Sequence, residues 1–452
     1  MWTYKANAAM GSPAIANGRV YVGSDDGNIY CLSAFDGTFL WSFPTGSEVE
    51  GCPAIAENHV YVGSADHNIY CLEANAGTKI WNHSTNGPIR SSPTVSNGRV
   101  YVGSYDGYLY ALNAADGTLA WKYQTGHAVQ SSPAVANGRL YFGSNDRNLY
   151  CLNSFNGSLI WKFNTGTWVA SSPALADGRV YFGTDGSYFY ALNDSNGEVS
   201  WQFPTIYGVS SSPAIIEGKV YFGSRDLNVY CLNGTSGTEI WKFKTNAWIT
   251  GSPAIADGKV YVGEGMRVWS DRSSIYCLVA STGTLKWNFT VNYSGSWISS
   301  SPAIAYGNVY VGSDDGYLYV FGSSQVSPPR PEITIVSPAN LTYNTSSVLL
   351  VFTVDVSTYW TGYSVDGKEN MTVAGNFTLT NLSNGSHSLT VYANDTYGTM
   401  NGAQPVFFKV AVPEPEAFPF APVIAAVMLS VTVIVGLLFH FKKRNTKQQL
   451  GN

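Results

Sequence analysis

The chain has 452 residues, a net charge of −5 and 12% charged residues, about half the usual share. Its length allows two or three domains, and its 46 glycines and 14% aromatic residues are typical of a turn-rich all-β protein rather than a helical one. The acidic balance and the scattered basic residues argue against nucleic acid as a partner, because nucleic acid is bound by basic patches.

A repeat of 40 residues runs through the first two thirds of the chain. A repeat of this length indicates one supersecondary unit copied in tandem, in which each copy buries its apolar face against its neighbours. Six tryptophans keep the spacing: Trp41, Trp81, Trp121, Trp161, Trp201 and Trp241. Seven prolines keep it as well: Pro13, Pro53, Pro93, Pro133, Pro173, Pro213 and Pro253.

Each repeat contains four short β-rich runs, which we call strands A to D. In residues 92–123 these runs are SPTVS, RVYVGS, YLYALNA and TLAWKY, with the hairpin signals Asn97-Gly98 and Asp116-Gly117 between them. The unit is therefore predicted to be a four-stranded antiparallel meander. Meanders of about 40 residues set radially form a β-propeller.

The number of strands predicts eight blades and the way in which the ring closes. Strand A with its proline occurs eight times, the last time at Pro302, and strand D with its tryptophan occurs eight times, from Trp2 to Trp287. The chain thus opens on a lone strand D and ends on strands A, B and C. We expect residues 2–6 to pair with residues 317–321, because an open array would leave two exposed strand edges.

Residues 111–121, ALNAADGTLAW, resemble the tryptophan-docking motif of quinoprotein (PQQ-like) β-propellers. That family includes pyrroloquinoline-quinone (PQQ) dehydrogenases and the outer-membrane assembly lipoprotein. A glycine precedes the tryptophan by four residues at Gly37, Gly77, Gly117, Gly157, Gly197, Gly237 and Gly283. The resemblance covers residues 2–322 and implies that these tryptophans pack between blades as structural residues: Trp41, Trp81, Trp121, Trp161, Trp201, Trp241 and Trp287.

We expect no catalytic residue, metal or cofactor, and hence no enzyme. The resemblance implies that a dehydrogenase would carry an adjacent cysteine pair, an acidic calcium site and a catalytic Asp, but the closest cysteines here are Cys52 and Cys71. The six histidines show no ligand spacing. Asp recurs in the B–C turns, where it is a turn former, at Asp26, Asp66, Asp106, Asp146, Asp226 and Asp315.

The six cysteines are predicted to be free, buried thiols. Five of them occupy equivalent positions of strand C. Equivalent residues of neighbouring blades lie about one sheet spacing apart, roughly 10 Å, whereas a disulfide needs Cα atoms within about 7 Å.

The repeat loses its symmetry on one predicted face, where the D–A loops and the B–C turns emerge together. Aromatic residues gather there, and a B–C turn six residues longer than the others adds further side chains. Clustered aromatic residues suggest ligand binding, although they could instead pack on one another inside the ring. The ligand-binding hypothesis names Trp168, Trp248, Trp297, Tyr207, Arg267 and Trp269.

The rest of the chain is predicted to be a stalk and an anchor. After the propeller (1–322) and a Pro-rich linker (323–331), residues 332–411 alternate as an Ig-like or fibronectin-like sandwich that resembles stalk modules of prokaryotic, especially archaeal, surface proteins. A Pro-rich linker (412–419) precedes an apolar stretch predicted to be a transmembrane helix (420–441), and a basic cytoplasmic tail (442–452) follows.

Thirteen Asn-x-Ser/Thr sequons favour export, although Met1–Lys5 is no signal sequence, which suggests missing upstream residues. Glycosylation is predicted at the seven that lie in the sandwich: Asn340, Asn344, Asn370, Asn376, Asn381, Asn384 and Asn394.

The sequence therefore predicts a non-catalytic binding or scaffold protein of the cell surface. It would be a single-pass membrane protein, with the propeller and the sandwich outside the cell and the C-terminus in the cytoplasm. Its propeller face would bind a surface protein, an envelope component or a glycan. The alternatives are a PQQ-dependent oxidoreductase and an envelope assembly scaffold.

Overall fold

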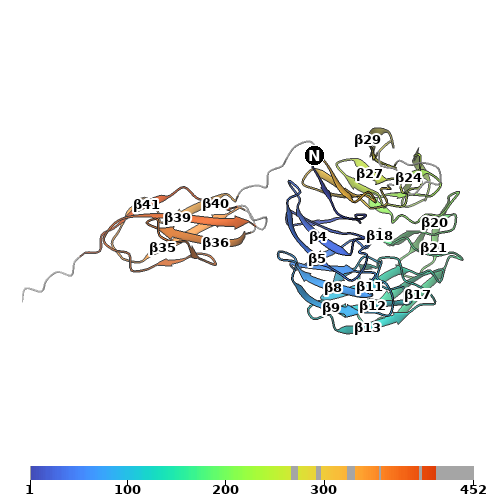
Figure 1. Cartoon of the computed structure of the whole chain (residues 1–452), viewed down its shortest axis with the longest axis horizontal. Coiled ribbons are helices and arrows are strands. Elements are labelled where there is room, and N and C mark those ends of the chain that lie inside the picture. Colours follow the sequence, from blue (N-terminus) through green and yellow to red (C-terminus); the bar gives the residue numbers. More distant parts are fainter. Residues whose placement is uncertain are drawn as a thin grey trace, which may run out of the picture. The chain divides into compact units, whose positions relative to one another are not determined.

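The structure, a computed structural model, describes residues 2–265, 273–291, 297–322, 331–355, 358–395 and 400–413. The chain divides into two compact units, Met1–Pro329 and Arg330–Asn452. Within the described residues every regular element is a β-strand (Figure 1).

The first unit consists of eight four-stranded sheets, the blades. Blade 1 contains β2 (Ala14–Ala16), β3 (Arg19–Gly23), β4 (Asn28–Ser33) and β5 (Phe39–Pro44). Blade 2 contains β6 (Ala54–Ala56), β7 (His59–Gly63), β8 (Asn68–Glu73) and β9 (Lys79–Ser84). Blade 3 contains β10 (Thr94–Ser96), β11 (Arg99–Gly103), β12 (Tyr108–Asn113) and β13 (Leu119–Gln124). Blade 4 contains β14 (Ala134–Ala136), β15 (Arg139–Gly143), β16 (Asn148–Asn153) and β17 (Leu159–Asn164).

The next three blades repeat this order of strands A to D. Blade 5 contains β18 (Ala174–Ala176), β19 (Arg179–Gly183), β20 (Tyr188–Asn193) and β21 (Val199–Pro204). Blade 6 contains β22 (Ala214–Ile216), β23 (Lys219–Gly223), β24 (Asn228–Asn233) and β25 (Glu239–Lys244). Blade 7 contains β26 (Ala254–Ala256), β27 (Lys259–Gly263), β28 (Ser273–Val279) and β29 (Leu285–Val291).

Blade 8 is built from both ends of the propeller sequence. It contains β30 (Ala303–Ala305), β31 (Asn308–Gly312) and β32 (Tyr317–Gly322), and its strand D is β1 (Trp2–Lys5). β1 is antiparallel to β32, with Trp2 opposite Val320 and Lys5 opposite Tyr317. Figure 1 shows the blue N-terminal strand beside the strands of this last blade. The eight blades and the closing strand are as the sequence predicted.

The local sequence explains the hairpin turns of each blade, and packing between blades explains how its apolar surface is buried. Asn97 and Gly98 both have positive φ (50° and 69°), as a two-residue type I′ hairpin turn requires. Strands B and C are buried on both faces, because each blade covers its neighbour: Tyr61, Cys71 and Trp81 of blade 2 share a core with residues of blade 3. No blade could bury its apolar surface alone.

Except in blade 7, the strand-D tryptophan packs on the C–D turn of the next blade. Trp81 Nε1 donates to Ala114 O at 2.9 Å, and Tyr61 Oη donates to the same carbonyl at 3.4 Å. Gly117 (φ 70°) lies against the indole, so closely that an added Cβ would be 2.5 Å from Trp81 Cε3. This is the packing between blades that the resemblance implied.

A ring of hydrogen bonds surrounds the central channel at the start of the A strands. Backbone N–H groups donate to the hydroxyl of the equivalent serine one blade further, for example Ser92 N to Ser132 Oγ at 2.9 Å. Seven such bonds run from Cys52 through the ring to Ser12. Among the described residues the bond from Ser12 N–H to position 52 is missing, because Cys52 replaces the serine. Its thiol instead lies 3.7 Å from Pro13 O and from Pro53 O.

Cys52→Ser is expected to raise the free energy of unfolding by about 1 kcal/mol, the net value of one hydrogen bond. The new hydroxyl would accept from Ser12 N–H and complete the ring. Urea unfolding of the full chain measures the change. Cys71→Ser is the matched control: Cys71 lies in an apolar inter-blade core, so its replacement should destabilise the protein. A loss of stability in Cys52→Ser would contradict the prediction.

All six cysteines are free, as predicted. Cys31, Cys71, Cys151, Cys231 and Cys277 are buried, and Cys52 is half-buried in the channel wall. Burial raises the pKa of the Cys31 and Cys52 thiols to about 12, so both are protonated and unreactive at neutral pH.

The second unit contains two sheets. One contains β33 (Ile333–Ser337), β35 (Val348–Val354) and β38 (Phe377–Leu379). The other contains β34 (Thr342–Tyr343), β36 (Thr358–Val365), β37 (Met371–Thr372), β39 (Gly385–Asp395), β40 (Met400–Gly402) and β41 (Val406–Val410). Both contribute to one core: Val348, Leu350 and Leu379 from the first, and Leu389, Val391, Phe408 and Val410 from the second. The assignment of this two-layer unit to the Ig-like or fibronectin-like class stays a prediction.

The predicted C-terminal helix needs a correction. Within the described ranges no helix is long and apolar enough to cross a membrane. Residues 420–441 themselves lie outside those ranges. A membrane-spanning helix needs an unbroken helical hydrogen-bond ladder, and the regular elements of the described residues are all strands. The transmembrane helix is therefore not part of the observed fold, and the single-pass membrane localisation that depended on it is not supported.

Candidate functional site

The D–A loops and the B–C turns form one face of the ring, which we call the B–C face. In blade 5, Asp185 N of the B–C turn donates to Trp168 O of the loop that enters the blade, at 2.9 Å. The same bond joins Gly265 N to Trp248 O (2.7 Å) and Asp314 N to Trp297 O (2.9 Å). The three loop tryptophans of the binding hypothesis therefore lie on one face, on the loops into blades 5, 7 and 8.

Aromatic and apolar side chains are exposed over blades 5 and 6, which we call the aromatic sector. Trp168 is 49% exposed, Tyr207 61% and Ile206 74%. Trp168 stacks on His127, with ring centroids 6.3 Å apart and planes 24° apart. Side chains of this size and exposure are available to a ligand.

A charged pair joins the aromatic sector to blade 7. Arg225 Nη2 lies 3.4 Å from Asp185 Oδ1, and the Arg225 guanidinium lies over the Trp248 ring, 6.0 Å from its centroid. Among the described residues no ring contact joins any two of Trp168, Trp248 and Trp297. Trp168 and Trp248 thus contact polar and charged neighbours, His127 and Arg225, rather than each other.

Carboxylates gather on blades 8, 1 and 2, which we call the acidic sector: Asp25, Glu48, Glu50 and Asp314. Arg90 bonds to Glu50 and lies 3.6 Å from Glu48 Oε2. Burial, and then the charges of Asp25 and Asp315, raise the pKa of Asp314 to about 6, although Ser299 opposes this by donating a hydrogen bond. Burial also raises the pKa of Asp25, to which the charge of Glu48 adds. One arginine does not balance these carboxylates, so the sector attracts cations.

The recurring turn aspartates are structural rather than part of a binding site. Asp66 accepts hydrogen bonds from Asn68 N–H (2.8 Å), Tyr70 Oη (2.6 Å) and Gly46 N–H (2.6 Å), which ties the B–C turn to strand C and to the entering loop. Burial raises the carboxyl pKa of Asp66, but the hydrogen bonds outweigh it and the pKa is lowered. In blade 7, whose turn is longer, buried Glu264 accepts the equivalent bond from Tyr276 Oη at 2.8 Å.

The structure locates four of the six hypothesised binding residues on the B–C face: Trp168 and Tyr207 are exposed, and Trp248 and Trp297 are half-buried. Arg267 and Trp269 lie outside the described residues. Sequence reasoning missed the acidic sector. Its members come from loops of different blades, and only the closure of blade 8 onto blade 1 brings Asp314 near Asp25. In a closed ring of eight blades the B–C turn of blade 8 is next to that of blade 1. Counting the turns in the sequence could therefore have predicted that Asp314 lies near Asp25.

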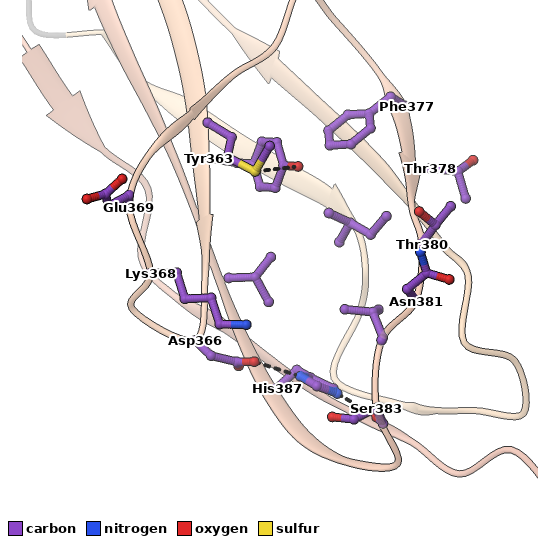
Figure 2. Close-up of a pocket in the computed structure, with 14 residues that line it drawn as sticks. Tyr363, Asp366, Lys368, Glu369, Phe377, Thr378, Thr380, Asn381, Ser383 and His387 are labelled. Atoms are coloured by element: carbon purple, nitrogen blue, oxygen red, sulfur yellow. Dashed lines mark hydrogen bonds and ion pairs between the residues drawn. The ribbon is translucent and has the colours of Figure 1, made fainter.

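The second unit contains an open cavity of about 510 Å³ between the β36–β37 side and the loop after β38, shown in Figure 2. At its base His387 Nδ1 lies 2.9 Å from Asp366 Oδ2, and His387 Nε2 lies 2.8 Å from Ser383 O. Both neighbours are acceptors, which favours the protonated imidazolium and raises the pKa of His387. Because both ring nitrogens are engaged, we assign the His387–Asp366 pair a structural role.

The stability of the second unit is expected to fall as the pH rises above about 6.5, the ordinary histidine value. The Ser383 carbonyl, and with it Asp366, raises the pKa of His387 against the opposing effect of burial. A pKa that is higher in the folded state than in the unfolded state adds stability. This stability is fully present below the pKa of the unfolded state and is lost as the pH rises through the pKa of the folded state. Hydrogen exchange of β36 and β39 at several pH values measures this loss. His387→Gln should remove the pH dependence, and an unchanged slope would contradict the prediction.

The sequon asparagines of the second unit are largely at its surface. Asn394 is half-buried in β39, and the six others are exposed. Asn384 is already engaged, since its side chain donates to Val412 O and accepts from Val412 N–H. Glycosylation at these seven positions stays a prediction.

Two protein families match the propeller. The family described as the β-propeller of beta-alanine-activating enzyme matches residues 95–321, half of the 452-residue chain. The chain belongs to this β-propeller family. The family described as outer membrane protein assembly factor BamB matches residues 1–85 and 50–131. The PQQ-like repeat that the docking motif indicated is thereby confirmed.

Several solved structures have the same fold as the propeller part of this chain. BamB from Moraxella catarrhalis is 15% identical, with a TM-score of 0.59, over 70% of this chain and 97% of that one. The computationally designed Ika8 protein is 17% identical, with a TM-score of 0.63, over 71% and 98%. Quinohemoprotein alcohol dehydrogenase ADHIIG from Pseudomonas putida HK5 is 15% identical, with a TM-score of 0.59, over 75% and 78%. No curated protein sequence matches the chain. At these identities the likeness shows the fold alone.

Proposed function

We propose that this chain is a non-catalytic scaffold whose B–C face binds a protein partner. The observation that carries the proposal is the division of that face into an exposed aromatic sector and an acidic sector, on a ring that is otherwise built from repeats. Exposed Trp and Tyr side chains are the residue types that dominate protein interfaces. Here Trp168, Tyr207 and Ile206 are largely in water, so they are free to be buried by a partner.

The chemistry of the two sectors indicates which side chains the partner should present to this face. An apolar side chain of the partner would pack against Trp168 and Tyr207. Lysine or arginine side chains would pair with the carboxylates of Asp25, Glu48 and Asp314, which a single arginine leaves in excess. The similarity to an outer membrane protein assembly factor supports a role in holding other proteins together.

Site-specific photo-crosslinking tests the face directly. A crosslinking amino acid at position 207 is expected to capture one partner in the native cell, which mass spectrometry then identifies. The matched control is position 155, because Phe155 is also aromatic and 74% exposed but lies in a C–D turn at the opposite end of the ring.

Binding of the purified partner then measures the contribution of each sector. The double variant Trp168→Ala, Tyr207→Ala should weaken binding about 100-fold or more, because interface aromatics of this kind contribute about 2 kcal/mol each. Phe155→Ala should leave the affinity unchanged. Equal capture at positions 207 and 155, or full affinity in the double variant, would refute binding through this face.

The second candidate function is a PQQ-dependent oxidoreductase, which the fold of the quinohemoprotein alcohol dehydrogenase and of a europium-containing methanol dehydrogenase favours. The residues present do not fit the calcium-bound quinone. The chain has no adjacent cysteines, and within the described ranges no three His, Cys, Asp or Glu side chains are arranged to hold a metal. Incubation with the quinone, calcium or a lanthanide, and alcohols tests this candidate. Dye reduction above a protein-free control would overturn the non-catalytic proposal.

A further inference from the structure

Within the described residues the ring has eight blades but seven C–D turns. In blades 1 to 7 the chain passes from strand C to strand D through a turn, whereas in blade 8 strand D is β1 from the other end of the propeller sequence. Each strand-D tryptophan packs on the C–D turn of the following blade. Among the residues that the structure describes, Trp287, on strand D of blade 7, therefore has no such turn to pack on.

A filled position shows which groups the turn satisfies. In blade 4, Arg139 Nη1 (3.0 Å), Tyr141 Oη (3.2 Å) and Trp161 Nε1 (3.1 Å) all donate to the carbonyl oxygen of Asp194 in the turn of blade 5. The Asp194 carboxylate also lies 3.7 Å from Arg139 Nη1. Gly197 (φ 75°) rests on the indole, where an added Cβ would be 2.7 Å from Trp161 Cε3.

In blade 7 the three equivalent donor residues line a cavity instead of contacting a turn. Lys259, Tyr261 and Trp287 occupy the positions of Arg139, Tyr141 and Trp161, and they line a cavity of about 450 Å³. Among the described residues, neither Tyr261 Oη nor Trp287 Nε1 donates to a backbone carbonyl. The Trp287 ring contacts Tyr261 and Phe321, with centroids 6.0 and 5.6 Å away. These neighbours hold the indole in place, so the half-site is already formed.

We propose that this half-site binds a glycine turn of a partner protein, of the form Asp-x-x-Gly. In the seven filled positions a carbonyl oxygen accepts from the tyrosine, and a glycine with positive φ lies against the indole. The aspartate of the ligand is based on the turn of blade 5 alone, where the Asp194 carboxylate lies beside Arg139, the counterpart of Lys259. The cavity includes Gly307 of the A–B turn, so it lies at the end of the ring opposite the B–C face. The inference is therefore independent of the proposed function.

A cyclic peptide with the sequence of residues 191–200, ALNDSNGEVS, is the probe, and calorimetry with the full chain measures its binding. We expect saturable binding at one site. The matched control peptide carries Gly197→Ala and should bind at least about tenfold more weakly, because its Cβ would meet the indole. A peptide with Asp194→Asn should bind about threefold more weakly and lose its sensitivity to salt.

Variants of the protein locate the site. Trp287→Leu should abolish peptide binding, and Tyr261→Phe, which removes only a hydroxyl donor, should weaken it several-fold if the leucine variant does not fold. Trp168→Ala on the opposite end should bind the peptide as the wild type does. No saturable binding by the full chain, equal binding of the two glycine-position peptides, or unchanged binding by both site variants overturns the proposal.

Discussion

Gly117→Ala is expected to destabilise the propeller by about 3 kcal/mol. Two costs add. The backbone at this residue has φ 70°, where alanine is strained by about 1 kcal/mol, and the new Cβ would lie 2.5 Å from Trp81 Cε3. The indole cannot move aside freely, because its Nε1 donates to Ala114 O and its ring is buried between two blades.

Gly98→Ala is the matched control for the backbone cost. Gly98 has φ 69°, and no atom lies within 4 Å of the position that a Cβ would take. We therefore expect it to lose only the strain, about 1 kcal/mol. Urea unfolding of both variants and the wild type measures the difference. Equal losses in the two variants would show that contact with the tryptophan contributes nothing.

Deletion of residues 1–5 is expected to lower the free energy of unfolding by roughly 5 kcal/mol. The deletion removes the four residue pairs between β1 and β32, the Trp2 indole that packs on Gly37, and the contact between the Tyr4 and Tyr30 rings at 5.7 Å. It also opens the ring and leaves β32 as an unpaired edge. An exposed edge pairs with other chains, so the variant should self-associate as well as melt at a lower temperature.

The solvent-facing residues of the same strand supply the control. Thr3 and Lys5 are exposed, and the double variant Thr3→Ala, Lys5→Ala keeps the backbone ladder, so its stability should stay within about 0.5 kcal/mol of the wild type. Differential scanning calorimetry and sedimentation velocity measure melting and association. A monomeric deletion variant with an unchanged melting temperature would contradict a closing role for β1.

The propeller could be predicted because the same strand and turn signals occur in every blade of the sequence. A misread turn in one copy is corrected by the others, and the offset between Trp2 and Trp287 alone specified how the ring closes. The second unit has no such redundancy. Residues 370–380, NMTVAGNFTLT, alternate in the manner of one strand, but they contain β37 and β38, which belong to different sheets. Alternation of polar and apolar residues indicates a strand, and it does not specify which sheet the strand joins.

The binding face was only partly predictable for a related reason. Exposed aromatic residues in irregular loops stand out in a repeat, so Trp168 and Tyr207 could be found. Arg225 and Asp185 could not be paired from sequence, because 40 residues separate them and only the radial order of blades brings them together. Likewise, Asp366 meets His387 because β36 pairs with β39, with Val365 opposite Leu389.

The pairing of β1 with β32 also sets the order of events during synthesis. β1 leaves the ribosome about 300 residues before its partner β32, an interval on the order of 15–60 s at ordinary translation rates. Blades 1 to 7 can form while the chain grows, but the ring cannot close. Throughout that interval Trp2 and the free edge of β1 are open to a chaperone, so depletion of such a helper should reduce the yield of the protein more than its final stability.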